Sequence, residues 1–592
     1  MSDATVPLSS RLEPRLLRTK TLHRLAYPLL AVFCLMLWLP GILSLPPLDR
    51  DESRFAQSSR QMLESGNFVD IRFGQVPRYK KPVGIYWMQA AATAIAGHLE
   101  NPSSLDRIWT YRLPSLMGGI AAVWLTFWLG SEFGADVGLV AALLLGFSVL
   151  ATAEAMIATT DAVLLACVTA VQGVLLRLYR AGAEGRPVSA RLVLWGWAAF
   201  AIGILVKGPV APAVALVTVA ALLLWDWRSK RGPSWFWLKA VRPWAGSALA
   251  LLIVAPWLIA IYRQSQGAFF QQSLGNDFAA KLASGQESHG APPGYYLITS
   301  TLAFWPAILF VLPGVGLAIT RAREPMVRFL LAWAGASWLM FEAVPTKLPH
   351  YVLPAYPALA ILAALWVTGD EATRIKPHGF NWQKLLKGVA IVQYAVGLAA
   401  LSLAPVLLPK FFGAGPAINL SAYALVGGLL GLSALVMLLL RVRLMACGLA
   451  LLSFLILAPL LTAGAGPRLG QFWVSQKLAA LVAKDSRPGD PAPILAGYEE
   501  PSMVFALGKD VSLTDGGGAA RLGSERGGLA LVDDRELPFF LARLAELQSD
   551  AVAVGQVTGF NYSRGRRVHV TVYRVRKLIY APVPAHWGLN VP

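Results

Sequence analysis

Long apolar segments recur along most of the chain, and their spacing predicts a polytopic α-helical membrane protein. A helix needs about 20 mostly apolar residues to cross a bilayer. About thirteen segments meet this requirement within a few residues at each end. They cover residues 25–45, 112–131, 137–153, 157–179, 190–206, 208–227, 243–262, 296–319, 327–344, 352–368, 388–408, 421–440 and 444–462. A further apolar stretch, 83–98, is short and follows Lys80-Lys81-Pro82, so we predict an interfacial helix on the outer face there.

Basic loops between these segments set the expected orientation, because short cytoplasmic loops are enriched in Lys and Arg. With the N-terminus inside, the basic loops all fall on the cytoplasmic side, whereas counting 83–98 as a span would invert them. These loops are 180–191, 228–242, 320–328, 369–387 and 441–443. We therefore expect residues 1–24 to be a basic cytoplasmic N-terminus and 25–462 to form the membrane domain. Residues 46–111 would be its first periplasmic loop.

The pattern changes after residue 462, where apolar runs of strand length replace the long segments. These runs are 493–496, 503–506, 529–532 and 551–557. Residues 537–547 have the spacing of an amphipathic helix, and 561–565 reads as the turn of a hairpin that continues with alternating residues 568–575. We expect residues 463–592 to form a small periplasmic α/β domain. An odd number of spans would place it outside.

Composition supports a membrane protein and excludes the soluble classes. Of the 592 residues 56% are hydrophobic and 14% charged, and the mean hydropathy is +0.54. The net charge of +19 suits short cytoplasmic loops and anionic lipids, so no nucleic-acid partner is expected. Cys34, Cys167 and Cys447 all lie in apolar segments and form neither a disulfide framework nor a metal knuckle.

Acids and bases cluster in the first outer loop, beginning with Asp49-Arg50-Asp51-Glu52-Ser53-Arg54. Asp51 opens an amphipathic helical pattern, so it can act as a helix cap, as an acid that handles an acceptor hydroxyl, or as both. Further along the loop, Arg78, Lys80 and Lys81 precede Pro82. They can snorkel to lipid headgroups or clamp a lipid-linked phosphate.

Isolated ionisable residues elsewhere fall on the same predicted outer face. Asp161 opens an apolar helix, and Lys207 precedes a Gly-Pro break between two apolar runs. His289 lies in a polar loop, and Lys347, His350 and Tyr351 join two spans. Each has a structural alternative, as a cap, a snorkelling lysine or a structural histidine. The sequence contains no Walker loop, no dinucleotide-binding glycine motif and no Ser-His-Asp arrangement.

Taken together, three motifs resemble the polyprenyl-phosphate-dependent glycosyltransferases of the C-type membrane fold. They are residues 49–54, residues 78–82 with Tyr86-Trp87, and residues 347–354. The branch that they resemble most is the lipid A aminoarabinose transferase and its relatives, alongside the protein O-mannosyltransferases. The likeness covers most of the membrane region and weakens in the C-terminal domain.

The resemblance implies an inverting transfer of a sugar from an undecaprenyl-type phosphate to lipid A or another cell-envelope glycan. It places a multi-pass enzyme in a bacterial inner membrane, surrounded by membrane lipids, with its active site on the periplasmic face. The expected catalytic residues are Asp51, Glu52 and Asp161. The expected ligands of the donor phosphate are Arg54, Arg78, Lys80, Lys81, Lys207, Lys347 and Tyr351. His289 and His350 are candidates for the acceptor side.

One position departs from the pattern of the lipid A branch, which carries Glu before the Lys-Pro pair in a triplet linked to a metal site. Here that residue is Lys80. A second cation cannot ligate a metal, so we expect a metal-independent transfer without any cofactor. A neutral or acidic sugar would suit the added positive charge better than aminoarabinose does.

Three other classes of function remain open from the sequence. A transporter or flippase for polyprenyl-linked sugars would explain the many spans, but it predicts functional groups on both faces or internal repeats, and neither is evident. A protein O-glycosyltransferase would differ only in its acceptor. A structural or receptor protein that binds through its C-terminal domain would leave the acids and bases of the first loop unexplained.

Overall fold

The computed structural model describes most of the chain. The described residues are 20–100, 105–230, 232, 235–273, 275, 290–369, 382–413, 415 and 418–578. They divide into two compact units, each described here by itself. The membrane unit comprises residues 1–45, 58–72 and 76–468, and the C-terminal unit comprises 46–57, 73–75 and 469–592.

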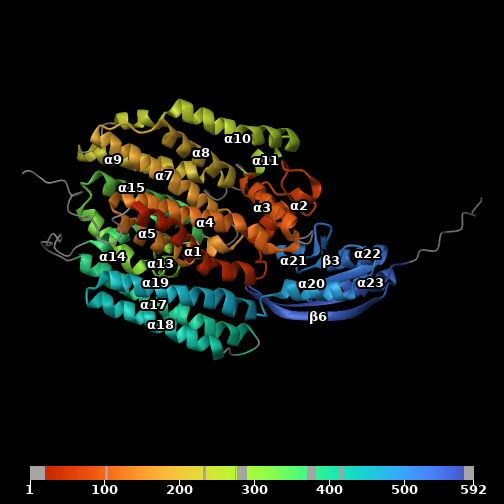
Figure 1. The fold of residues 1–592 in the computed structure, drawn as a ribbon. Coiled ribbons are helices and arrows are strands. Elements are labelled where there is room, and N and C mark those ends of the chain that lie inside the picture. Colours follow the sequence, from red (N-terminus) through yellow and green to blue (C-terminus); the bar gives the residue numbers. More distant parts are fainter. Residues whose placement is uncertain are drawn as a thin grey trace, which may run out of the picture. The chain divides into compact units, whose positions relative to one another are not determined.

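The membrane unit is built almost entirely from helices (Figure 1). Helix α2, Asp51–Ser65, begins in the C-terminal unit and ends in the membrane unit. The other helices are α1 (Lys20–Ser44), α3 (Gly84–Glu100), α4 (Ile108–Gly130), α5 (Ala135–Gly146), α6 (Val149–Met156), α7 (Asp161–Glu184), α8 (Ala190–Lys207), α9 (Val210–Ser229), α10 (Pro243–Ser265), α11 (Ala268–Phe270), α13 (Tyr295–Ala303), α14 (Ile308–Thr320), α15 (Pro325–Ala343), η6 (Pro349–Ala355), α16 (Tyr356–Thr368), α17 (Trp382–Phe412), α18 (Ile418–Leu439) and α19 (Arg443–Pro459).

Fewer of these helices can cross a bilayer than the apolar pattern predicted. Ten helices of the described residues are long and apolar enough, or eleven when the α5–α6 pair, bent by 64°, counts as one span. The expected span 296–319 is broken into α13 and α14 around Phe304–Ala307, and expected span 327–344 forms α15, which carries Arg328 and Glu342. Among the described residues, helices of spanning length and composition are thus fewer than the thirteen expected segments, because two of these segments are broken or carry charges. The doubtful stretch 83–98 forms α3, which is not among the ten.

Glycines bring the helices of the membrane unit into close contact. A Cβ added at Gly118 of α4 would lie 2.7 Å from the backbone nitrogen of Val163 in α7. A Cβ added at Gly84 of α3 would lie 2.8 Å from the backbone carbonyl of Leu205 in α8. Because α7 begins at Asp161 and α8 ends at Lys207, these contacts place the two charged helix ends as well as the helices.

A buried polar cluster joins α7, α9 and α15 at their other ends. Arg328 donates from Nη1 to Asp226 Oδ1 at 2.6 Å, and Tyr179 donates its hydroxyl to the same carboxylate at 2.9 Å. Since an unpaired charge is costly away from water, the three groups stabilise this helix arrangement only as a set.

The C-terminal unit contains a five-stranded mixed sheet with the strand order β4-β3-β5-β7-β6. Its strands are β3 (Ile494–Ala496), β4 (Ser512–Thr514), β5 (Gly528–Asp533), β6 (Ala551–Asn561) and β7 (Arg566–Val575). Strand β3 pairs parallel with β4 and β5, and β7 pairs antiparallel with β5 and β6. The predicted C-terminal hairpin is β6–β7.

Helices cover both faces of this sheet. They are α20 (Val474–Asp485), α21 (Pro501–Leu507), α22 (Gly516–Arg526) and α23 (Leu537–Leu547). Leu529 and Leu531 of β5 pack in one cluster with side chains of α20 and α21, and the alternate residues Ala530 and Val532 pack in a second cluster with side chains of α22 and α23. Alternate side chains of β5 therefore point to opposite faces of the sheet, and each set packs in its own hydrophobic core.

One predicted strand is wrong. Residues 503–506 lie in the helix α21, where Met503, Val504 and Phe505 are buried. A short apolar run does not distinguish a buried strand from a buried helical turn, and Pro501 at the first helical position favours the helix.

We predict that Gly84→Ala destabilises the membrane unit, because its new Cβ would overlap the Leu205 backbone and push α3 away from α8. The expected loss is about 1–3 kcal/mol, measured as a lower thermal midpoint of the purified protein in detergent. Gly335→Ala is the matched control, since nothing lies within 4 Å of a Cβ at this helical glycine. Equal midpoints for the two variants would contradict the close packing.

Candidate functional site

A cavity of roughly 420 Å³ in the membrane unit collects six of the residues that the sequence singled out. Its polar wall is formed by Lys80, Lys81, Asp161, Lys207, His350 and Tyr351. Three lysines and one carboxylate line it, so the charges of the lining residues sum to an excess of positive charge. A cavity of this kind attracts an anion.

The local backbone explains why Asp161 and Lys207 meet. Asp161 is the first residue of α7, and Lys207 is the last residue of α8. Gly208 ends α8 with φ of +61°, a conformation that suits glycine, and Pro209 follows directly before α9. Since α7 begins where α8 ends, Asp161 and Lys207 lie together at one end of the helix bundle.

The two charges form a direct ion pair with little exposure to solvent. Lys207 Nζ lies 2.5 Å from Asp161 Oδ1, and the side chains are 9% and 8% exposed. Thr160 donates its hydroxyl to the other oxygen of Asp161 at 3.1 Å. The carboxylate therefore holds the ammonium group in the cavity wall and offsets the cost of burying it.

His350 and Tyr351 complete the polar wall from η6. Lys207 Nζ lies 5.7 Å from the centroid of the Tyr351 ring, within range of a cation–π interaction. His350 Nδ1 lies 3.7 Å from Glu154 Oε1, and Thr159 donates its hydroxyl to the other oxygen of Glu154 at 2.8 Å. Glu154 does not line the cavity itself, but it contacts His350 and so helps to hold this side chain in the wall.

Apart from Ser273, the rest of the cavity wall is apolar. Its members include Leu164, Ile204, Leu258, Phe269, Phe270 and Phe341. Sequence reasoning missed them, because apolar side chains occur throughout this chain and carry no local signal. A wall of this kind beside clustered ammonium groups suits an amphiphile with an anionic head and a hydrocarbon tail.

Two predicted phosphate ligands of the membrane unit lie outside this cavity lining. Arg78 is buried and donates from Nη1 to the hydroxyl of Tyr86 at 2.6 Å. Lys347 is buried and donates from Nζ to the carbonyl of Val344 at 2.8 Å. Arg78 thus contacts a side chain of α3, and Lys347 contacts the backbone at the end of α15. His289 lies outside the described residues.

The remaining predicted residues, Asp51, Glu52 and Arg54, belong to the C-terminal unit. Asp51 is exposed at the first position of α2. Glu52 is buried, and its Oε2 accepts a hydrogen bond from the Leu48 backbone at 2.8 Å. This contact gives Glu52 a role in closing the loop before α2, and it leaves Asp51 as the acid with access to solvent.

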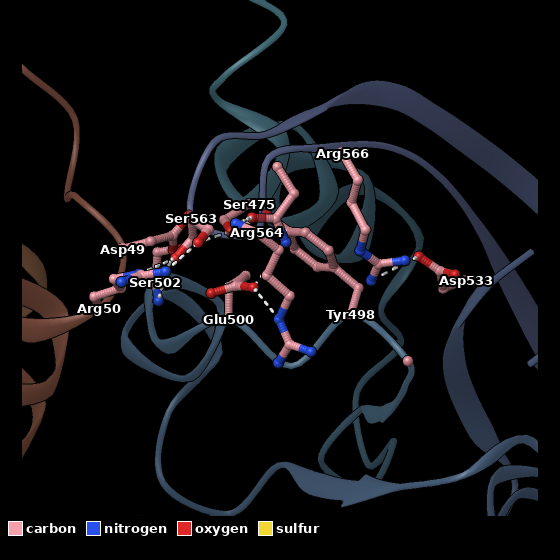
Figure 2. A network of polar contacts seen from close by, with 12 residues as sticks. Asp49, Arg50, Ser475, Tyr498, Glu500, Ser502, Asp533, Ser563, Arg564 and Arg566 are labelled. Carbon is pink, nitrogen blue, oxygen red and sulfur yellow. Dashed lines mark hydrogen bonds and ion pairs between the residues drawn. The ribbon is translucent and has the colours of Figure 1, made fainter. Parts of the chain in front are cut away.

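The residues just before Asp51 join a polar network that the sequence did not predict (Figure 2). Asp49 Oδ1 accepts a hydrogen bond from the Ser502 hydroxyl, and the Asp49 backbone donates to the Tyr562 hydroxyl at 2.7 Å. Burial raises the pKa of Asp49 to about 6, while the Ser502 hydrogen bond opposes this shift and the nearby Glu500 carboxylate adds to it.

A metal site is not evident in the described part of the chain. Among those residues, no group of three or more His, Cys, Asp or Glu side chains could hold a metal ion.

Comparison with known proteins finds relatives by sequence. The family described as dolichyl-phosphate-mannose-protein mannosyltransferase matches residues 80–259. The chain is 26% identical over 383 residues to the undecaprenyl phosphate-alpha-4-amino-4-deoxy-L-arabinose arabinosyl transferase of Pectobacterium carotovorum subsp. carotovorum, covering 62% of this chain and 64% of that enzyme. The transferase of the same description from Edwardsiella ictaluri is 29% identical over 348 residues, covering 58% of this chain and 59% of that enzyme. The similarity thus spans less than two thirds of the length of either relative.

Solved structures show the fold. The crystal structure of ArnT from Cupriavidus metallidurans bound to undecaprenyl phosphate superposes with a TM-score of 0.69 at 19% identity, covering 92% of this chain and 97% of that one. The archaeal oligosaccharyltransferase AglB from Archaeoglobus fulgidus gives a TM-score of 0.52 at 13% identity, covering 86% of this chain and 69% of that one.

We predict that Asp49→Asn stabilises the C-terminal unit at neutral pH. Because burial raises the carboxyl pKa from 3.8 to about 6, the contribution of Asp49 to stability is full below pH 3.8 and is lost as pH rises through 6. A neutral amide avoids this loss, so the variant should exceed wild type by on the order of 2–3 kcal/mol at pH 8 and converge with it near pH 4.

Hydrogen exchange of residues 46–57 and 498–507 in the full-length protein would measure this difference as a function of pH. Asp510→Asn, which alters an exposed carboxylate of the same unit, is the control. An advantage of Asp49→Asn that grows as the pH falls would contradict the raised pKa.

Proposed function

We propose that this chain, a multi-pass membrane protein related in sequence to the aminoarabinose transferases and sharing the fold of ArnT, is an inverting glycosyltransferase. It would move a sugar from a polyprenyl phosphate to lipid A or another cell-envelope glycan on the periplasmic face of a bacterial inner membrane. The single observation that carries this proposal is the cavity, in which Lys80, Lys81 and Lys207 face an apolar wall. The phosphate of the donor would lie against the ammonium groups, and the first isoprene units would lie against the apolar side chains.

The chemistry of the transfer explains why cations are needed there. The bond between the anomeric carbon and the phosphate oxygen breaks, and an oxygen of the acceptor bonds to that carbon from the opposite face, which inverts its configuration. The polyprenyl phosphate leaves with one more negative charge than it carried as a diester. Ammonium groups fixed near this phosphate stabilise the developing charge more than they stabilise the bound donor.

Lys81 and Lys207 would have different parts in this step. Lys207 is fixed by Asp161, so its position is set before the donor arrives. Lys81 precedes Pro82, whose ring restricts the backbone, and it lines the cavity from the segment just before α3. We propose Lys81 as the main ligand of the departing phosphate, with Lys80, Lys207 and Tyr351 as further ligands.

Asp51 would serve the acceptor. An exposed carboxylate at a helix start can orient an acceptor hydroxyl and accept its proton as the new bond forms. If the acceptor oxygen belongs to a phosphate, as on lipid A, it needs little deprotonation, and Asp51 would mainly position it. The similarity to the protein mannosyltransferase family over residues 80–259 favours protein O-glycosylation as the second candidate function.

We predict that Lys81→Met weakens binding of undecaprenyl phosphate by roughly 10- to 100-fold, because a charge-assisted hydrogen bond contributes about 1.5–3 kcal/mol. Titration of the purified protein with the lipid, followed by its intrinsic tryptophan fluorescence, would measure this affinity. Lys410→Met, which removes an ammonium group of α17 that does not line the cavity, is the control. Unchanged affinity in Lys81→Met would contradict the assignment of the cavity to the donor.

We also propose that the transfer needs no metal ion, since Lys80 stands in the cavity wall where an acid would be needed as a ligand. Transfer by protein dialysed against EDTA should equal transfer by untreated protein, and added Mg²⁺ or Mn²⁺ should not raise it. A rate that falls on dialysis and returns with one of these ions would overturn this part of the proposal.

A further inference from the structure

The C-terminal unit holds the segment that carries Asp51. Residues 46–57 pack with the described residues from 469 to 578 in one compact unit, although more than 400 positions separate them along the chain. Four side chains of the C-terminal domain make hydrogen bonds to this segment among the described residues. Gln476 of α20 donates from Nε2 to the Pro47 carbonyl at 3.3 Å, and the contacts nearest to Asp51 come from Ser502 at the start of α21 and from Tyr562 and Ser563 in the β6–β7 turn. Figure 2 shows Asp49 and Arg50 lying against Ser502 and Ser563.

We propose that Ser502, Tyr562 and Ser563 are positioning residues of the transfer, which fix the backbone before α2 and thereby aim the carboxylate of Asp51. This inference rests on the proposed function, in which Asp51 handles the acceptor. It gives the C-terminal domain a defined part in the reaction, because this domain holds the segment that carries the acceptor-handling acid, Asp51.

Asp49 is held on two sides. Its backbone N–H donates to the Tyr562 hydroxyl at 2.7 Å, and its side chain accepts from the Ser502 hydroxyl. The Ser502 hydroxyl in turn lies 2.5 Å from that of Ser475, which lies 3.1 Å from the Tyr498 hydroxyl. Since Ser475, Ser502 and Tyr498 are all buried, the groups that hold Asp49 are themselves fixed by packing.

Arg50 adds a constraint on the backbone direction. Its φ is +65°, in the left-handed region that is unfavourable for a residue with a side chain. Its guanidinium donates from Nε to the Ser563 hydroxyl at 3.0 Å and from Nη2 to the Ser563 carbonyl. Contacts at this residue stabilise an otherwise costly conformation, and that conformation sets the direction in which α2 leaves the loop, beginning with Asp51.

The hairpin turn that reaches Asp49 and Arg50 is also rigid. Asn561 donates from Nδ2 to Glu500 Oε1 at 2.7 Å, and Arg564 donates from Nε to the same oxygen at 3.1 Å. The Arg564 backbone donates to Asn561 Oδ1 at 3.0 Å, and Gly565 follows with φ of +67°. Glu500 and Asn561 are buried, so the turn presents Tyr562 and Ser563 from a fixed base.

The result is an exposed acid beside two clamped residues. Asp51 is accessible to a ligand, while Asp49 and Arg50 directly before it are tied to the domain. Catalytic groups need this combination, because a displacement of about 1 Å costs on the order of 100-fold in rate. A C-terminal domain that only bound a partner would not need to engage the residues next to Asp51.

The test compares Tyr562→Phe and Ser502→Ala with the wild type in the full-length protein. Ser502, Tyr562 and Ser563 together form the clamp on the residues before α2. Each variant removes one hydroxyl from this clamp and leaves Asp51 and the cavity residues unchanged. Tyr573→Phe and Ser549→Ala, which remove hydroxyls of the same domain away from residues 46–57, are the matched controls. The readouts are kcat and KM of sugar transfer, affinity for undecaprenyl phosphate, and hydrogen exchange of residues 46–57.

We expect kcat to fall roughly 10- to 100-fold in both clamp variants, with unchanged affinity for undecaprenyl phosphate and faster hydrogen exchange of residues 46–57. The controls should match the wild type in all readouts. A general loss of structure would lower the lipid affinity as well, so the difference between kcat and affinity identifies positioning.

Two outcomes would overturn different claims. Wild-type transfer together with unchanged kcat in both clamp variants would overturn the positioning role alone. Absence of transfer in the wild-type protein, tested with its lipid-linked donors, would overturn the proposed function itself. Faster hydrogen exchange without a change in kcat would also reject the role in aiming Asp51.

Discussion

The ion pair between Asp161 and Lys207 is the constraint on which the candidate site depends. An ammonium group beside apolar walls is stable only when a carboxylate is close, and a carboxylate at the start of an apolar helix needs a cation for the same reason. The pair can form because α8 ends at Lys207, directly before Gly208, and α7 begins at Asp161 on the same level. Close packing of α3 on α8 and of α4 on α7 then fixes the wall that carries Lys80 and Lys81.

The two halves of the proposed reaction fall in different units of the chain. The cations and the apolar wall for the donor belong to the membrane unit, and the exposed acid Asp51 belongs to the C-terminal unit. A division of this kind would allow related enzymes to keep one donor site while the C-terminal domain changes with the acceptor. It also explains why the C-terminal domain devotes buried hydroxyls such as Ser502 to the residues before α2.

Hydrophobic periodicity predicted the membrane fold and the hairpin well, because long helices and alternating strands leave a strong local pattern. It did not reveal where the helices bend or break, since an apolar composition persists across the bend between α5 and α6 and across the break at Phe304–Ala307. It also took residues 503–506 for a strand, where periodicity over four residues is too short to decide.

The candidate site was partly predictable for a similar reason. Isolated charges such as Asp161 and Lys207 are conspicuous against an apolar background, and the structure brings them together. The apolar wall with Phe269 and Phe270 has no such contrast. The clamp on Asp49 joins residues more than 450 positions apart through ordinary serine and tyrosine hydroxyls, so no local pattern reveals it.

The most direct test of the central claim is mass spectrometry of lipid A, core oligosaccharide and surface glycans from the organism that carries this chain. A deletion strain would be compared with strains restored by the wild type or by Asp51→Ala. The proposed glycosyltransferase predicts that a sugar is missing in the deletion strain and returns only with the wild type. Unchanged glycans in the deletion strain, or full restoration by Asp51→Ala, would contradict the account.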